Sequence, residues 1–108
     1  MASLVTRQFD VCRYPGQSTE TDAPYVCVIQ SHYLAGMDTV IVAPLLRTTL
    51  IATESQVAVP VSVDGKDYAL DLALMANIEM RDLGPVVGSL LDHEFDIRRA
   101  LDRLFTGF

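Results

Sequence analysis

The sequence has no tryptophan and only one lysine, and its acidic residues clearly outnumber its basic ones. Eight Lys and Arg residues stand against 14 Asp and Glu residues, which gives a formal net charge of −6. A surface that binds DNA or RNA gathers Lys and Arg because it must neutralise phosphates. The chain by itself is therefore not expected to bind nucleic acid directly.

Histidine and cysteine are also scarce, with two of each. No two-histidine or Cys-x-x-Cys spacing typical of a metal site is present, and the glycines form no phosphate-binding loop. The sequence therefore predicts no metal, no cofactor and no catalytic residue, so an enzyme is not expected. His32 and His93 are interpreted as solvated. Cys12 and Cys27 lie in apolar runs and are expected to be buried thiols, with a bridge between neighbouring strands as the weaker alternative.

Long apolar runs are absent. The longest covers residues 40–46, is interrupted by Pro44, and is much shorter than a membrane span. The first residues lack the basic and then apolar segments of a secretory signal. With 50% hydrophobic residues in 108, the chain is expected to be one cytoplasmic domain over residues 1–108, with no membrane contact.

Strand signals dominate up to about residue 90. The alternation in Gln8–Tyr14 predicts a strand with Phe9 and Val11 on one side and Cys12 on the other. Tyr25–Ile29 and Thr39–Ala43 are rich in β-branched residues, which predicts strands that are buried on both faces. Between the first two strands, the polar segment 15–24 is interpreted as a loop.

A hairpin is predicted around Asp64 and Gly65, because a type I′ turn needs positive φ at both central positions. Its strands are Val57–Val63 and Lys66–Leu72, and Pro60 places the first of them at an edge or at a bulge. Residues 76–83 are predicted as a further strand, closed by Gly84 and Pro85. The pattern as a whole indicates a mainly β fold: a small barrel or strongly curved sheet with a C-terminal α-helix.

The last fourteen residues, 95–108, predict that helix. Their apolar positions recur at helical spacing, and Gly107 is placed to end the helix in the left-handed conformation. The residues on this face are Ile97, Ala100, Leu101, Leu104 and Phe108. We expect the exposed end to contact a partner, although Phe108 packing against the domain is the simpler interpretation.

Four segments in order resemble the CcdB family, the toxins of toxin–antitoxin modules. They are Gln8-Phe-Asp-Val11, Val28-Ile-Gln-Ser31, Val42-Ala-Pro-Leu45 and the ending Asp96-Ile-Arg-Arg-Ala-Leu-Asp-Arg-Leu-Phe-Thr-Gly-Phe108. The resemblance implies an SH3-like barrel of antiparallel strands with a C-terminal helix, a homodimer and no cofactor. It also implies a cytoplasmic protein that binds the A subunit of DNA gyrase and traps the enzyme on cleaved DNA.

The resemblance places gyrase-contacting residues in two segments of the chain. They are Tyr33 and Leu34 after the second strand, and Asp102, Phe105, Thr106, Gly107 and Phe108 at the end of the helix. Thr106 stands where the best-known pattern has a tryptophan, and Asp102 where it has an amide. Aromatic anchors often carry about 2 kcal/mol or more of an interface, so this difference matters for gyrase binding.

An antitoxin partner is implied as well, with a disordered C-terminal segment that wraps the toxin and a joint complex that represses its own operon. The resemblance places its contacts near the loop 15–24 and after Pro44, at Tyr14, Leu45, Leu46 and Arg47. Because the chain is acidic, we expect the antitoxin segment to carry compensating basic residues.

Two alternatives to a gyrase poison remain open on the sequence. One is a module without toxicity that still binds an antitoxin, which the Thr106 difference favours. The other is an mRNA-cleaving toxin of the related fold. That function needs acid and base groups around a phosphate, and Arg13, Arg47 and Arg81 are scattered without such neighbours.

Overall fold

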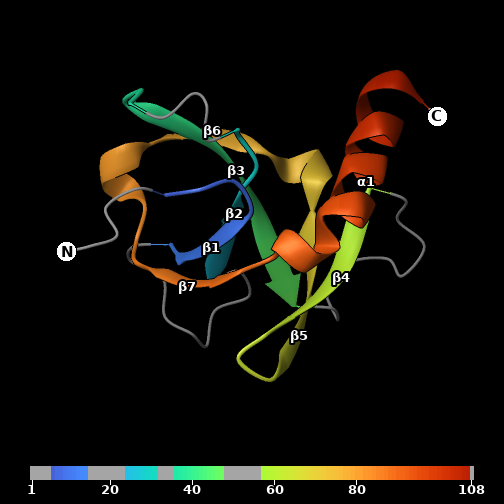
Figure 1. The fold of residues 1–108 in the computed structure, drawn as a ribbon, viewed down its shortest axis with the longest axis horizontal. Coiled ribbons are helices and arrows are strands. Elements are labelled where there is room, and N and C mark those ends of the chain that lie inside the picture. The colour runs from blue at the N-terminus through green and yellow to red at the C-terminus, as the bar shows by residue number, and fades with distance from the viewer. Residues whose placement is uncertain (1–5, 15–23, 32–35, 48–56, 108) are drawn as a thin grey trace.

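In the part of the chain that the structure describes, seven antiparallel strands form one curled sheet, a half-barrel, and a single α-helix packs beside it (Figure 1). The computed structural model describes residues 6–14, 24–31, 36–47 and 57–107. The strands are β1 (Asp10–Arg13), β2 (Tyr25–Val28), β3 (Thr39–Arg47), β4 (Ala58–Val63), β5 (Lys66–Asp71), β6 (Ala76–Glu79) and β7 (Val86–Ser89). The mainly β fold with a C-terminal helix is therefore confirmed.

The sheet has the strand order β4-β5-β3-β2-β1-β7, and β6 pairs with the other half of β3. Short 3-10 turns join the strands: η3 (Leu72–Leu74), η4 (Met80–Asp82) and η5 (Leu91–His93). The helix α1 (Glu94–Thr106) follows η5 directly. Among the described strands, β4 and β7 stand at the two ends of this order, and each pairs with a neighbour on one side only.

Strands β1 and β2 separate two apolar clusters. Phe9 and Val11 belong to the larger cluster, whereas Cys12 belongs to the smaller one, so the predicted alternation is confirmed. All four residues of β2 are buried, as expected for a central strand covered on both faces. The predicted strand Gln8–Tyr14 is shorter in the structure and covers Asp10–Arg13, because Phe9 has a φ of 72° and is not extended.

Strand β3 is longer than predicted and continues through Pro44 to Arg47. It pairs with β6 over 39–42 and with β5 over 45–47, so Pro44 falls where one partner gives way to the other. Backbone groups along β3 point alternately toward β2 and away from it. Because Ile41 O accepts from Ile29 N, the register places the Pro44 nitrogen on the side away from β2. Proline is thus tolerated because no ladder bond is lost. The prediction that both faces of this strand are buried was wrong at Ile41, which is exposed.

The hairpin β4–β5 has the predicted geometry. Asp64 and Gly65 have φ values of 53° and 76°, and Val63 faces Lys66 across the turn. These two positive angles are those of a type I′ turn, whose twist matches the flanking strands. Pro60 lies in β4 at the end of the sheet, as its missing N–H predicted.

The segment after the hairpin differs from the sequence expectation in two ways. The predicted strand over 76–83 ends at Glu79, and Met80–Asp82 form the turn η4. Residues 86–89 form β7, which pairs with β1 and had not been predicted. Gly84 lets the chain before β7 pass close to the backbone of Arg13. Its N–H donates to Arg13 O at 2.8 Å, and a Cβ at this position would lie 2.3 Å from that oxygen.

Helix α1 buries the predicted face. Ile97 and Ala100 are fully covered, and Leu101 and Leu104 pack partly against the larger cluster. Gly107 ends the helix with φ 80°, and its N–H donates to Arg103 O at 3.0 Å. Among the described residues, no helix is long and apolar enough to cross a membrane.

Candidate functional site

The last turn of α1 presents the predicted contact residues to solvent. Asp102, Phe105, Thr106 and Gly107 are all exposed, and 70% of the Phe105 surface is accessible. In Figure 1 this end of the helix extends away from the sheet. Because an uncovered aromatic ring costs hydration free energy, burial of Phe105 against another surface would be favourable.

Local bonds fix the shape of this helix end. The Thr106 hydroxyl donates to Asp102 O at 2.5 Å, a back-bond across one helical turn. Gly107 turns the chain out of the helix through its left-handed conformation. The Thr106 hydroxyl is thus committed to the backbone, which leaves its methyl group and the Phe105 ring as the apolar surface.

Part of the predicted gyrase surface lies outside the described residues. Tyr33, Leu34 and Phe108 belong to this part. His32 and residues 15–23 of the predicted loop, which were not assigned to gyrase, also lie outside the described residues. The structure therefore assembles only the helical half of the predicted surface, from Asp102 to Gly107.

The predicted antitoxin contacts have different environments. Leu45 is fully buried in the larger cluster, so its side chain offers no surface on this chain. Leu46 and Arg47 are partly exposed at the end of β3, opposite Ala69 and Tyr68. Tyr14 is partly buried against the smaller cluster. Leu46 and Arg47 thus adjoin each other at the end of β3, whereas Tyr14 follows β1 and packs against the smaller cluster.

Other exposed apolar side chains had not been singled out from the sequence. They are Met37, Ile41, Leu74, Val86, Val87, Leu91 and Phe95. Phe95 is 69% exposed, and its ring lies 5.6 Å from the Arg99 guanidinium carbon. A helical projection centred on Ile97 puts Phe95 on the far side of α1, so its exposure was readable from the helical period.

Metal-binding side chains do not cluster in the described part of the chain. No three His, Cys, Asp or Glu residues there are arranged to hold a metal ion. His93 precedes the helix as its N-terminal flanking residue and is partly exposed. Of the three arginines considered for RNA, Arg13 lies in β1, Arg47 ends β3, and Arg81 pairs with Glu79 at 2.5 Å.

Comparison with known proteins links this fold to toxins. The family described as CcdB protein matches residues 8–107. No curated protein matches the sequence. Among solved structures, one titled "Crystal structure of Mtb toxin" is 19% identical with a TM-score of 0.72, covering 88% of this chain and 99% of that chain. The Mycobacterium tuberculosis toxin MazF-mt6 is 19% identical with a TM-score of 0.70, covering 92% and 96%. At this identity the two structures support the fold alone.

Proposed function

Because the chain belongs to the CcdB family, whose model matches residues 8–107, we propose that this toxin binds the A subunit of DNA gyrase and traps the enzyme on cleaved DNA. The observation that carries the proposal is the exposed end of α1, with Phe105 uncovered beside Asp102, Thr106 and Gly107. The function is one of binding, so it needs no catalytic residue and no cofactor.

Phe105 takes the role of the aromatic anchor in this proposal. The ring is rigid, exposed and next to the position where Thr106 stands in place of the tryptophan. Burying it against gyrase would supply part of the apolar area that the tryptophan supplies in the resembled pattern. The negative charge of Asp102, one turn earlier, would then face a polar or basic group on gyrase.

The family implies an antitoxin partner, and we propose that its disordered C-terminal segment neutralises the toxin. The partly exposed Leu46, Arg47 and Tyr14 are the described residues that this proposal assigns to the contact. A cytoplasmic homodimer that represses its own operon together with the antitoxin completes the proposal.

The first test mixes the purified protein with gyrase from its own host and plasmid DNA, and measures linearised DNA that is covalently linked to the enzyme. We expect cleavage with the natural protein and at least a tenfold loss, about 1.4 kcal/mol of binding, with Phe105→Ala. Leu91→Ala is the matched control, because Leu91 is also exposed and lies before the opposite end of the helix.

The outcomes separate the three candidate functions. Cleavage that survives Phe105→Ala would remove Phe105 from the contact. Growth arrest with cut mRNA and intact DNA would favour an RNA-cleaving toxin of the related fold. A folded protein that binds an antitoxin but causes no arrest would favour the module without toxicity.

A further inference from the structure

A hollow lies where strand β3 begins and strand β6 ends. It holds about 440 Å³, and its walls come from the start of β3, the end of β6 and the turn η4. The bond from Met80 N to Asp38 O, 2.8 Å long, ties the two walls together. The lining residues are Met37, Asp38, Thr39, Glu79, Met80 and Arg81.

Apolar side chains lie in this hollow and beside it on the sheet. Met37 is 53% exposed and Ile41 is 40% exposed. Because side chains alternate along a strand, Ile41 projects on the same face as Thr39, which lies opposite Glu79 in the ladder. Gln30 holds the two apolar residues in place, since its Nε2 donates to Met37 Sδ at 4.0 Å and its Oε1 accepts from Ile41 N at 3.2 Å. An apolar side chain of a ligand would therefore gain burial here, against thioethers that adapt to its shape.

The charges around the hollow favour a cationic ligand. Arg81 Nε lies 2.5 Å from Glu79 Oε2, so this arginine is already matched by a carboxylate. The exposed Asp38 adds a further negative charge, and Asp82, next along η4, is exposed as well. The whole chain carries a net charge of −6, which attracts a cation at long range. The local and the overall charge thus both complement lysine or arginine.

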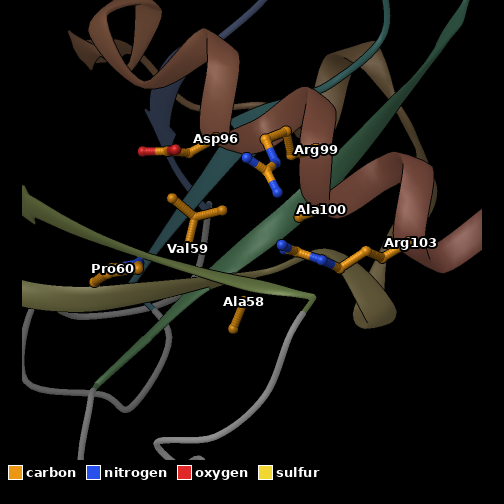
Figure 2. A pocket seen from close by; sticks show the side chains of 7 residues that line it. All are labelled: Ala58, Val59, Pro60, Asp96, Arg99, Ala100 and Arg103. Carbon is orange, nitrogen blue, oxygen red and sulfur yellow. The ribbon is translucent and has the colours of Figure 1, made fainter. Parts of the chain in front are cut away.

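A groove between helix α1 and strand β4 differs from this hollow in its charged groups. It holds about 360 Å³, and Figure 2 shows Arg99 and Arg103 reaching from α1 toward β4. One lining residue, Asp96, is acidic. Because two guanidinium groups repel a further cation, a basic ligand is better suited to the hollow between β3 and β6.

We propose that the hollow between β3 and β6 binds a basic segment of a protein partner, which seats one apolar side chain between Met37 and Met80 and places a lysine or arginine beside Asp38. Such a contact joins burial of an apolar side chain at its centre to a charge pair at its rim. None of the six lining residues is assigned to gyrase or to the antitoxin, so the inference goes beyond the proposed function and does not depend on it.

The test titrates the isotope-labelled full-length protein with the blocked peptide Lys-Lys-Leu-Lys-Lys and follows the backbone amide shifts. We expect the shifts to change over residues 37–41 and 77–82. A peptide with glutamate in place of each lysine should bind about tenfold more weakly or not at all, because its charge is repelled. A peptide with serine in place of leucine should bind about fivefold more weakly, because it buries less apolar surface.

Two variants of the protein test the two parts of the contact. Met37→Ala should weaken binding of the lysine peptide about fivefold by removing apolar surface, and Asp38→Asn about threefold by removing an exposed charge pair. Leu74→Ala is the matched control for the first, because Leu74 is 52% exposed and lies at the other end of β6. Asp67→Asn is the control for the second, because Asp67 is exposed in β5 and does not line this hollow. Both controls should bind as the natural protein does.

Several results would overturn the proposal. They are an absence of shifts, shifts confined to other residues, equal binding of the glutamate or serine peptide, and an equal loss with either control variant. Sedimentation of the free protein tests a different occupant. A dimer that excludes the peptide and dissociates with Met37→Ala would assign the hollow to a second copy of the chain instead.

Discussion

Cys12 and Cys27 lie on neighbouring strands, yet their side chains belong to opposite faces of the sheet. Cys12 packs in the smaller cluster and Cys27 in the larger one, and both are free thiols. In the register, Val11 rather than Cys12 faces Cys27, so the β-sheet itself separates the two sulfurs. The prediction of buried thiols, with a bridge as the weaker alternative, is confirmed, and the register gives its physical reason.

Burial raises the pKa of both thiols from 9.0 to about 12, and the Asp10 carboxylate adds to the shift. Burial also raises the pKa of Tyr68. Between about pH 9 and 12 the unfolded chain therefore loses protons that the folded chain keeps. We expect the contribution of these three groups to the free energy of unfolding to be constant below pH 9 and to fall as the pH rises above 9.

The measurement is urea unfolding at a series of pH values, followed by circular dichroism. A double Cys12→Ala and Cys27→Ala variant, less stable because it loses packing, should show a shallower decline above pH 9. An equally steep decline in that variant would assign the loss to other groups, such as Tyr68.

Gly84 is a residue whose role only the structure reveals. A Cβ there would meet Arg13 O at 2.3 Å and the Arg13 carbonyl carbon at 3.0 Å, and both are backbone atoms that cannot move alone. We expect Gly84→Ala to destabilise the protein by about 1–3 kcal/mol, as overpacking does. Gly88→Ala is the control, since open space surrounds that position. Equal unfolding free energies for the two variants would contradict this role.

At the scale of elements, the helix was the easiest to predict and β7 the hardest. The apolar period of α1 is complete, so Ile97 and Ala100 could be assigned to the core from spacing alone. Val86-Val-Gly-Ser89 is short, exposed at both valines and contains a glycine, so it carries no alternation to detect. Its pairing with β1 is a long-range choice that local pattern does not encode.

Ile97 and Leu101 of α1 are buried to different extents, so truncating them should lower the free energy of unfolding by different amounts. Ile97 is fully buried, whereas Leu101 is only partly covered. We expect Ile97→Ala to cost about 2–5 kcal/mol of unfolding free energy, and Leu101→Ala to cost less because solvent can reach the site. Denaturant unfolding of both variants measures this order. A larger loss at Leu101 would show that the helix packs in a different rotation.

The candidate site was predictable to the extent that it lies on the helix. Asp102, Phe105, Thr106 and Gly107 are exposed as expected, whereas Leu45, assigned to a partner by resemblance, is fully buried. When both faces of a strand are apolar, its sequence alone does not show which side chains are buried in the core and which remain available to a partner. The groove lined by Arg99 and Arg103 depends on β4 lying beside α1, which no local pattern states.

At the scale of the molecule, β3 joins the two halves of the sheet. It pairs with β2, β5 and β6, and its residues enter both apolar clusters. We expect one cooperative unfolding transition, because neither cluster can lose its packing while β3 keeps its neighbours.

Two probes test this cooperativity. The edge-to-face pair of Tyr25 and Tyr68, with ring centroids 5.6 Å apart, gives a near-ultraviolet signal from the larger cluster. Far-ultraviolet circular dichroism follows the whole sheet. The two curves should coincide in urea, and an earlier loss of the tyrosine signal would show that the larger cluster melts separately.

Pro60 has a consequence for how the protein behaves when it is abundant. It lies among the positions of β4 whose backbone groups point outward, so the open edge lacks one donor at its centre. A strand from another copy that paired here would lose one ladder bond at its centre, which makes this edge a weaker template for aggregation. The missing N–H of Pro60 thus counts against edge-to-edge association at this end of the sheet.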